Sequence, residues 1–195
     1  YNVFRISATE IVLEYNNPAN EGYAQVYLQP KGMKSSKHTF TRGDFGLNSA
    51  ENEEMEGHEG PATTKEGFKW YLDVEAGAEL FIWKTWGALQ VGAGWSANAD
   101  LHVKSIKLHT TDIPGNIKSI SVVCAYSDEA NQKKAELYAK VGGENFGTRK
   151  SLINDMSTYT FTDSVSASGE IELIWDSQEA GISYFIKSVE VIYQD

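Results

Sequence analysis

The residues best suited to chemistry in this sequence are aromatic, and three of its five tryptophans stand close together. Trp83, Trp86 and Trp95 lie within the segment "FIWKTWGALQVGAGW" at residues 81–95. An aromatic ring can stack on the flat, apolar face of a sugar, while a few placed polar groups bond its hydroxyl groups. We therefore predict that a ligand-binding surface forms from these tryptophans and from Trp70, Lys84, Gln90 and Asn98.

Spacing limits which of these rings share one surface. Trp83 and Trp86 differ by an odd step, so on an unbroken strand they face opposite sides, and a bend at residues 85–87 would bring both to one rim. Trp95 lies in "GAGWSANAD", a glycine- and asparagine-rich stretch typical of a loop. Trp70 and Tyr71 form a second odd-step pair. Packing in the core is the alternative for each ring, because buried tryptophan is common in β-proteins.

The segment "GEIELIWD" carries two glutamates that could do acid–base chemistry. It is similar to the Glu-aliphatic-Asp-aliphatic-x-Glu strand of laminarinase-type jelly-roll glycosidases, and retaining hydrolysis needs two carboxyl groups ~5–5.5 Å apart. Here Glu172 replaces the middle aspartate, and Trp175 stands where the last glutamate belongs. The catalytic pair is thereby broken, and we predict that Glu170 and Glu172 are solvated carboxylates on an outer face.

Other catalytic patterns are missing from the sequence. The four histidines are scattered without the spacing of a zinc site, and no Gly-x-Ser-x-Gly segment marks a nucleophilic serine. Cys124 stands in the apolar run "ISVVCAY", which favours a buried core residue over a nucleophile. We therefore expect a protein that is not an enzyme and that holds no cofactor.

Charge and length narrow the class further. The chain has 195 residues, which fits one domain over 1–195, and its 17 basic and 27 acidic residues give a net charge of −10. An acidic surface repels phosphate backbones, so we expect no nucleic acid partner. No stretch approaches the ~20 apolar residues of a membrane-spanning helix, so we expect no membrane insertion.

Residues 43–66 form the least regular part of the sequence. The run "GDFGLNSAENEEMEGHEGPATTKE" is rich in glutamate and poor in large apolar residues. We predict a long acidic loop, since blocks of charge are usually solvated. Structural calcium is the open alternative, because this cation prefers several oxygen ligands, although the regular spacing of a calcium-binding loop is missing.

β-Strands are the elements that must position these residues. Short segments rich in β-branched and aromatic residues alternate with glycine-, proline- and asparagine-containing turns. In "IELIWD", Ile171, Leu173 and Trp175 share one side, so we predict that Trp175 is a core residue of an antiparallel sheet. The pattern predicts an all-β fold, an antiparallel β-sandwich of jelly-roll type. The predicted strands are residues 10–15, 23–29, 68–74, 78–84, 87–92, 101–108, 117–126, 135–141, 158–163, 171–176 and 183–193.

An ordered set of segments from about residue 88 to residue 193 carries a resemblance. It comprises "ALQVGAG", "KSIKL", "PGNIKSISVVCAYS", "LYAKVGGENFG", "STYTF", "SGEIELIW" and "YFIKSVEVIY". In this order the segments resemble a jelly-roll module, similar to carbohydrate-binding modules, attached to secreted and surface proteins of gut-type bacteria. The resemblance implies an extracellular or bacterial cell-surface location and a place within a larger multidomain protein.

These observations lead to one expected function and two alternatives. We expect non-catalytic binding of a polysaccharide or oligosaccharide, with aromatic side chains stacking on sugar rings. The first alternative is a structural or adhesion module of a cell-surface protein that has no small ligand. The second is a glycoside hydrolase or lyase, which would require two close carboxylates in a cleft.

Overall fold

The computed structural model describes residues 32–45, 53–54, 58–74, 78–83, 87–93, 103–127, 134–177 and 181–194. These residues form β-strands and a short 3-10 helix, η1, at Arg42–Phe45. The predicted strands at 10–15 and 23–29 lie outside the described residues. The strands are β1 Met33–Thr39, β2 Glu53–Glu54, β3 His58–Thr63, β4 Lys69–Asp73, β5 Glu79–Trp83, β6 Ala88–Val91, β7 Ser105–Thr110, β8 Asn116–Ser127, β9 Ala135–Val141, β10 Glu144–Asn145, β11 Lys150–Ser151, β12 Ser157–Ala167, β13 Ile171–Ser177 and β14 Ser183–Gln194.

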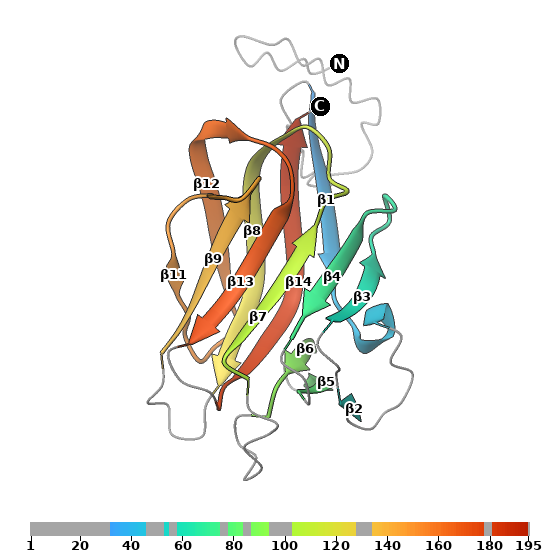
Figure 1. Ribbon diagram of the computed structural model, residues 1–195, viewed down its shortest axis with the longest axis vertical. Helices are drawn as coiled ribbons and strands as arrows, with labels where there is room; N and C mark the ends of the chain where they lie inside the picture. Colours follow the sequence, from blue (N-terminus) through green and yellow to red (C-terminus); the bar gives the residue numbers. More distant parts are fainter. Residues whose placement is uncertain are drawn as a thin grey trace, which may run out of the picture.

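The strands form two antiparallel sheets that pack face to face (Figure 1). Sheet A has the order β12-β8-β14-β6-β5-β2, with β1 also paired to β14. Sheet B has the order β10-β9-β13-β7-β4-β3, with β11 also paired to β9. From β6 onward the chain passes repeatedly from one sheet to the other, which places β6-β14-β8-β12 in sheet A opposite β7-β13-β9-β11 in sheet B. This connectivity is that of a jelly roll and confirms the predicted fold class.

The core lies between the two sheets and follows the alternation of the sequence. In β9 and β13 the side chains are buried and half-buried in strict alternation. Trp175 is fully buried, as predicted, together with Ile171 and Leu173 on the same face of β13. Burial of each large apolar side chain stabilises the fold by about 1.5–3 kcal/mol, so these inward faces hold the two sheets together.

Five described strands are missing from the sequence prediction, and three of them, β2, β10 and β11, have only two residues each. β1, "MKSSKHT", has little apolar content, but it pairs with β14 from Met33↔Gln194 to Thr39↔Ser188. β2 and β3 both lie inside the predicted acidic loop, so that prediction is wrong for Glu53–Glu54 and His58–Thr63. β3 stands at the edge of sheet B, where a register shift between Glu59 and Ala62 accommodates Gly60 and Pro61. An edge position tolerates proline because one side of the strand needs no hydrogen-bond donor.

Helices contribute little to the described part of the chain. In that part, no helix has both the length and the apolar character that crossing a membrane requires.

Candidate functional site

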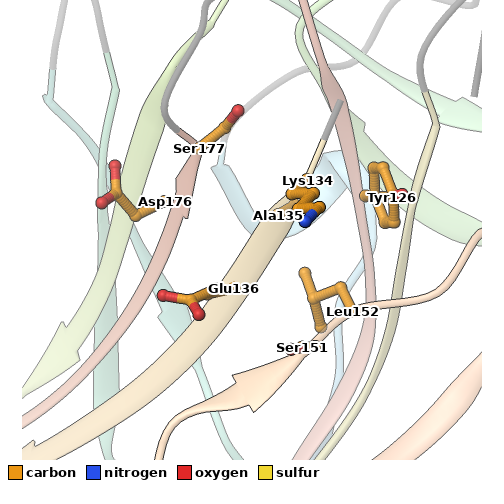
Figure 2. A pocket seen from close by; sticks show the side chains of 8 residues that line it. All are labelled: Tyr126, Lys134, Ala135, Glu136, Ser151, Leu152, Asp176 and Ser177. Carbon is orange, nitrogen blue, oxygen red and sulfur yellow. The ribbon is translucent and has the colours of Figure 1, made fainter. Parts of the chain in front are cut away.

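A pocket of about 350 Å³ lies at one end of the sandwich, where β8, β9, β11 and β13 meet (Figure 2). The strands that bring it together are far apart in the sequence but adjacent in the fold. Its lining residues are Tyr126, Lys134, Ala135, Glu136, Ser151, Leu152, Asp176 and Ser177.

Strand register explains how the pocket forms. Asp176 pairs with Glu136, and Ser177 pairs with Ala135, across β13 and β9. Ala135 and Ser177 are the buried, inward residues of their strands, whereas Glu136 and Asp176 belong to the half-buried, outward set. The pocket therefore extends from the gap between the sheets to the rim of the outer face of sheet B.

The pocket combines apolar and polar walls. Figure 2 shows Tyr126 and Leu152 on one side of β9 and the carboxylates of Glu136 and Asp176 on the other, with Lys134 between them. The Arg149 Nη1 donates a hydrogen bond of 3.3 Å to Glu136 Oε2. Within the described part of the chain, no hydrogen bond or ion pair engages the side chains of Asp176 and Lys134.

One predicted binding segment begins and ends near the pocket. In sheet A, Tyr184 pairs with Val91 on one side and with Tyr126 on the other. The last residues of β6 and β8 therefore lie at the same end of the sheet. At the other end of this segment, Val103 forms an isolated β-bridge with Ile182. Ile182 directly precedes Ser183, the first residue of β14. The chain between residues 93 and 103 therefore leaves and re-enters the fold at the pocket end of the sandwich. Trp95 and Asn98 belong to that segment and lie outside the described residues.

Trp83 and Trp86, the other predicted pair of binding tryptophans, belong to a segment that begins farther from the pocket. Trp83 pairs with Ala88, three residues before Val91, which is roughly 10 Å back along β6 at ~3.3 Å per residue. Lys84 and Trp86, and the side chain of Trp83, lie outside the described part. The backbone thus places the Trp83–Ala88 pair farther from the pocket end than Val91.

Two of the predicted binding residues are buried, so their assignment is wrong. Trp70 is 1% exposed, and its ring meets the ring of Phe40 edge-on at 6.5 Å. It shares the inward face of β4 with Leu72, which leaves Tyr71 as the outward member of the pair. Gln90 is 0% exposed, and its Nε2 donates a hydrogen bond of 3.0 Å to the carbonyl of Gly92. Neither side chain reaches a surface ligand.

Glu170 and Glu172 lie on the outer face of sheet B, as predicted. Glu170 Oε1 is 2.9 Å from His109 Nδ1, and Glu172 Oε1 is 3.7 Å from Lys107 Nζ. Lys107 also contacts Asp73 Oδ2 at 3.0 Å, and this hydrogen bond is the main reason that the pKa of Lys107 is raised. Both glutamates are therefore engaged by basic groups in a surface charge network.

Neither a reactive cysteine nor a metal site is found among the described residues. Cys124 is fully buried, and burial raises the pKa of its thiol to about 12, which confirms the core interpretation and excludes a thiolate nucleophile. Among the described residues, no group of three or more histidine, cysteine, aspartate or glutamate side chains could hold a metal ion. Calcium in the acidic region remains a prediction.

Sequence reasoning missed the lining residues of the pocket. Tyr126, Lys134, Ser151 and Asp176 come from four separate segments, and each is ordinary in its local context. The one local signal is that Glu136 and Asp176 occupy outward positions at strand ends. Strand order alone makes these positions neighbours.

Comparison with solved structures finds distant similarities. No family model matches the sequence, and no curated protein matches it. A family 29 carbohydrate-binding module is 12% identical, with a TM-score of 0.43, over 83% of this chain and 90% of that chain. A family 61 module in complex with β-1,4-galactotriose is 11% identical, with a TM-score of 0.42, over 65% and 88% of the two chains.

One longer protein is similar to this chain over part of its own length. A family two carbohydrate esterase from Cellvibrio japonicus is 10% identical, with a TM-score of 0.39, over 83% of this chain. The chain spans 35% of the length of that esterase.

Proposed function

We propose that this chain binds carbohydrate without transforming it, and that the pocket at the end of the sandwich is the binding site. The observation that carries the proposal is the composition of that pocket. It joins an aromatic and aliphatic wall, Tyr126 and Leu152, to the carboxylate of Asp176 and the amine of Lys134.

This combination suits a sugar ring. A sugar has apolar C–H faces that pack against aromatic and aliphatic surface, and a rim of hydroxyl groups that both donate and accept hydrogen bonds. Asp176 would accept hydrogen bonds from hydroxyl groups, Lys134 would donate to them, and Ser151 would do either. The volume of about 350 Å³ is at the small end of ligand pockets, which favours one or two sugar units.

The tryptophans remain part of the proposal. Trp95 and Asn98 belong to the segment whose described ends lie at the pocket end, and we propose that they too bind the ligand. Trp83, Lys84 and Trp86 are proposed as a second stacking surface. The proposal also includes an extracellular or cell-surface location and a larger parent protein, as the sequence resemblance implies.

Hydrolysis is the second candidate, because Glu136 and Asp176 are cross-strand neighbours in the pocket. Such neighbours have Cβ atoms about 4.5–5.5 Å apart, which allows their carboxyl groups to reach the ~5–5.5 Å separation found in retaining glycosidases. A general acid in that reaction is kept protonated by an apolar environment. The Glu136 side chain is instead 47% exposed and ion-paired with Arg149, so we favour binding.

An adhesion surface has weaker support in the described residues. Their exposed large hydrophobic side chains are Ile153 and Val165. Val165 lies eight residues beyond Ser157, the start of β12, which is roughly 25 Å at ~3.3 Å per residue, and Ile153 precedes that start. The two side chains are therefore too far apart to form a single apolar patch.

Affinity electrophoresis tests the proposal. The protein is run through gels cast with neutral, amino and acidic polysaccharides, alongside Trp86→Ala and Trp95→Ala. We expect retardation by at least one polysaccharide, weakened in Trp95→Ala. Products released from the retarding polymer are measured in parallel. Release of shorter sugars would favour hydrolysis, and an absence of retardation across the panel would contradict carbohydrate binding.

A further inference from the structure

Three cross-strand pairs of β13 and β9, here called rungs, follow one another along the outer face of sheet B, and the first of them forms the rim of the pocket. Asp176 pairs with Glu136 in the first rung, Ile174 with Tyr138 in the second, and Glu172 with Lys140 in the third. All six side chains belong to the half-buried set of β13 and β9. Successive rungs are two residues apart, or about 6.6 Å at ~3.3 Å per residue.

The second rung differs in character from its neighbours. Ile174 and Tyr138 place an aliphatic and an aromatic side chain together between two charged rungs. A half-buried apolar pair beside a pocket offers a surface on which a second ring can pack.

Arg149 connects the second rung to the pocket. Its guanidinium carbon lies 4.2 Å from the centre of the Tyr138 ring, and its Nη1 donates to Glu136 at 3.3 Å. The cation therefore contacts both the rim of the pocket and the aromatic ring next to it. The guanidinium covers one face of the Tyr138 ring, and its remaining N–H groups are donors for hydroxyl groups of a ligand at this surface.

We propose that the binding site continues from the pocket onto the Ile174–Tyr138 rung, so that an oligosaccharide binds with one unit in the pocket and the next unit against Ile174 and the Arg149 guanidinium that covers the Tyr138 ring. This inference rests on the proposed carbohydrate-binding function and adds the course and length of the ligand. The third rung bounds the surface, because Glu172 is held by Lys107 at 3.7 Å. The site therefore accommodates a short chain of two or three units.

The test measures how affinity depends on chain length. Mono-, di-, tri- and tetrasaccharides of β-1,4-linked glucose, mannose, galactose, xylose and N-acetylglucosamine are titrated by NMR and calorimetry. We expect affinity in the recognised series to rise about tenfold from one unit to two or three, and then to level off. Tyr138→Ala should abolish that rise, and Tyr138→Phe should retain it.

Tyr71→Ala is the matched control, because Tyr71 is also a half-buried tyrosine on the outer face of sheet B but lies on β4, beyond β7. Thermal unfolding verifies that each variant is folded. If a monosaccharide binds but affinity does not rise with length, or if the rise persists in folded Tyr138→Ala, the extended site is wrong while carbohydrate binding stands. If no sugar of any length and no polysaccharide binds, both proposals are wrong.

Discussion

Asp176 at the end of β13 is the register partner of Glu136 at the start of β9, and both line the same pocket. Their environments differ, because Glu136 is bound by Arg149 whereas Asp176 has no hydrogen-bond or ion-pair partner among the described residues. A carboxylate already engaged by a cation has less capacity left for a ligand. We therefore propose separable roles for the two residues, with Asp176 as the acceptor for hydroxyl groups of the ligand and Glu136 as an anchor for Arg149.

Replacing Asp176 should weaken ligand binding without unfolding the protein. A hydrogen bond to a charged group contributes about 1.5–3 kcal/mol. Asp176→Asn should therefore lower the affinity roughly tenfold or more for the polysaccharide that slows the wild type in affinity electrophoresis. Calorimetry on the wild type and the variant measures the change. Glu144→Gln, an exposed glutamate in β10, removes the same charge and should leave affinity unaltered. Equal affinity of Asp176→Asn and wild type would remove Asp176 from the site.

Gly92 should be intolerant of any side chain. It has φ +83°, and a Cβ there would lie 2.5 Å from Val103 Cγ2 and 2.8 Å from the carbonyl of Ile182. Strain at positive φ and overpacking together predict that Gly92→Ala lowers the free energy of unfolding by about 3 kcal/mol or more. Guanidinium unfolding curves give this value.

Gly67 is the matched control for that substitution. Its φ is +88°, but a Cβ there would have no neighbour within 4 Å in the described part of the chain. Gly67→Ala should therefore cost only the conformational strain, about 1–2 kcal/mol. Similar costs at the two positions would show that the close approach of Val103 and Ile182 to Gly92 is relaxed in solution.

Cys124 should be unreactive in the folded protein. Burial raises the pKa of its thiol to about 12, so at pH 8 almost no thiolate is present and reagents have no access to the sulfur. Ellman's reagent should label the thiol only after guanidinium is added. Rapid labelling of the native protein at pH 8 would contradict the buried position on β8.

The contact between Ser36 and Glu66 should make stability depend on pH in the acidic range. Ser36 Oγ donates a hydrogen bond of 2.7 Å to Glu66 Oε2, and this bond is the main reason that the pKa of Glu66 is below its ordinary value of 4.5. A carboxyl group whose pKa falls on folding stabilises the fold above its unfolded pKa. That contribution is lost as the pH falls through the folded pKa.

Glu66→Gln therefore should lower stability slightly at pH 6 and not at pH 3. Because Glu66 is exposed, solvent screening limits the difference to less than about 1 kcal/mol. Unfolding curves at pH 3, 4, 5 and 6 measure it, with Glu144→Gln as the exposed control. A difference between wild type and Glu66→Gln that is constant over this range would rule out the charge of Glu66 as its source.

Several local features of the fold follow from the sequence. Alternation in "IELIWD" predicts the inward face of β13, including Trp175, because a strand with one buried face must repeat every two residues. The predicted strand at 135–141 coincides with β9, since its apolar and polar residues also alternate without interruption. Such patterns involve only neighbouring residues of one strand, so they can be recognised in the sequence without knowledge of the fold.

Other elements depend on their neighbours. β1 has few apolar residues, and its strand conformation is stabilised by backbone pairing with β14, more than 140 residues further along the chain. β3 carries Gly60 and Pro61, which argue against a strand unless it lies at a sheet edge. Neither partner nor edge position is visible in the local pattern.

The candidate site shows the same division. Trp70 and Gln90 have residue types suited to binding sugars, but residue type does not determine exposure, and both are buried by neighbours distant in sequence. The sequence by itself determined the fold class, the strand faces and the buried state of Cys124 and Trp175, because these depend on alternation along one strand. Only the tertiary structure decided where the pocket lies, because jelly-roll connectivity makes the ends of β8, β9, β11 and β13 neighbours in space while leaving them dispersed along the chain.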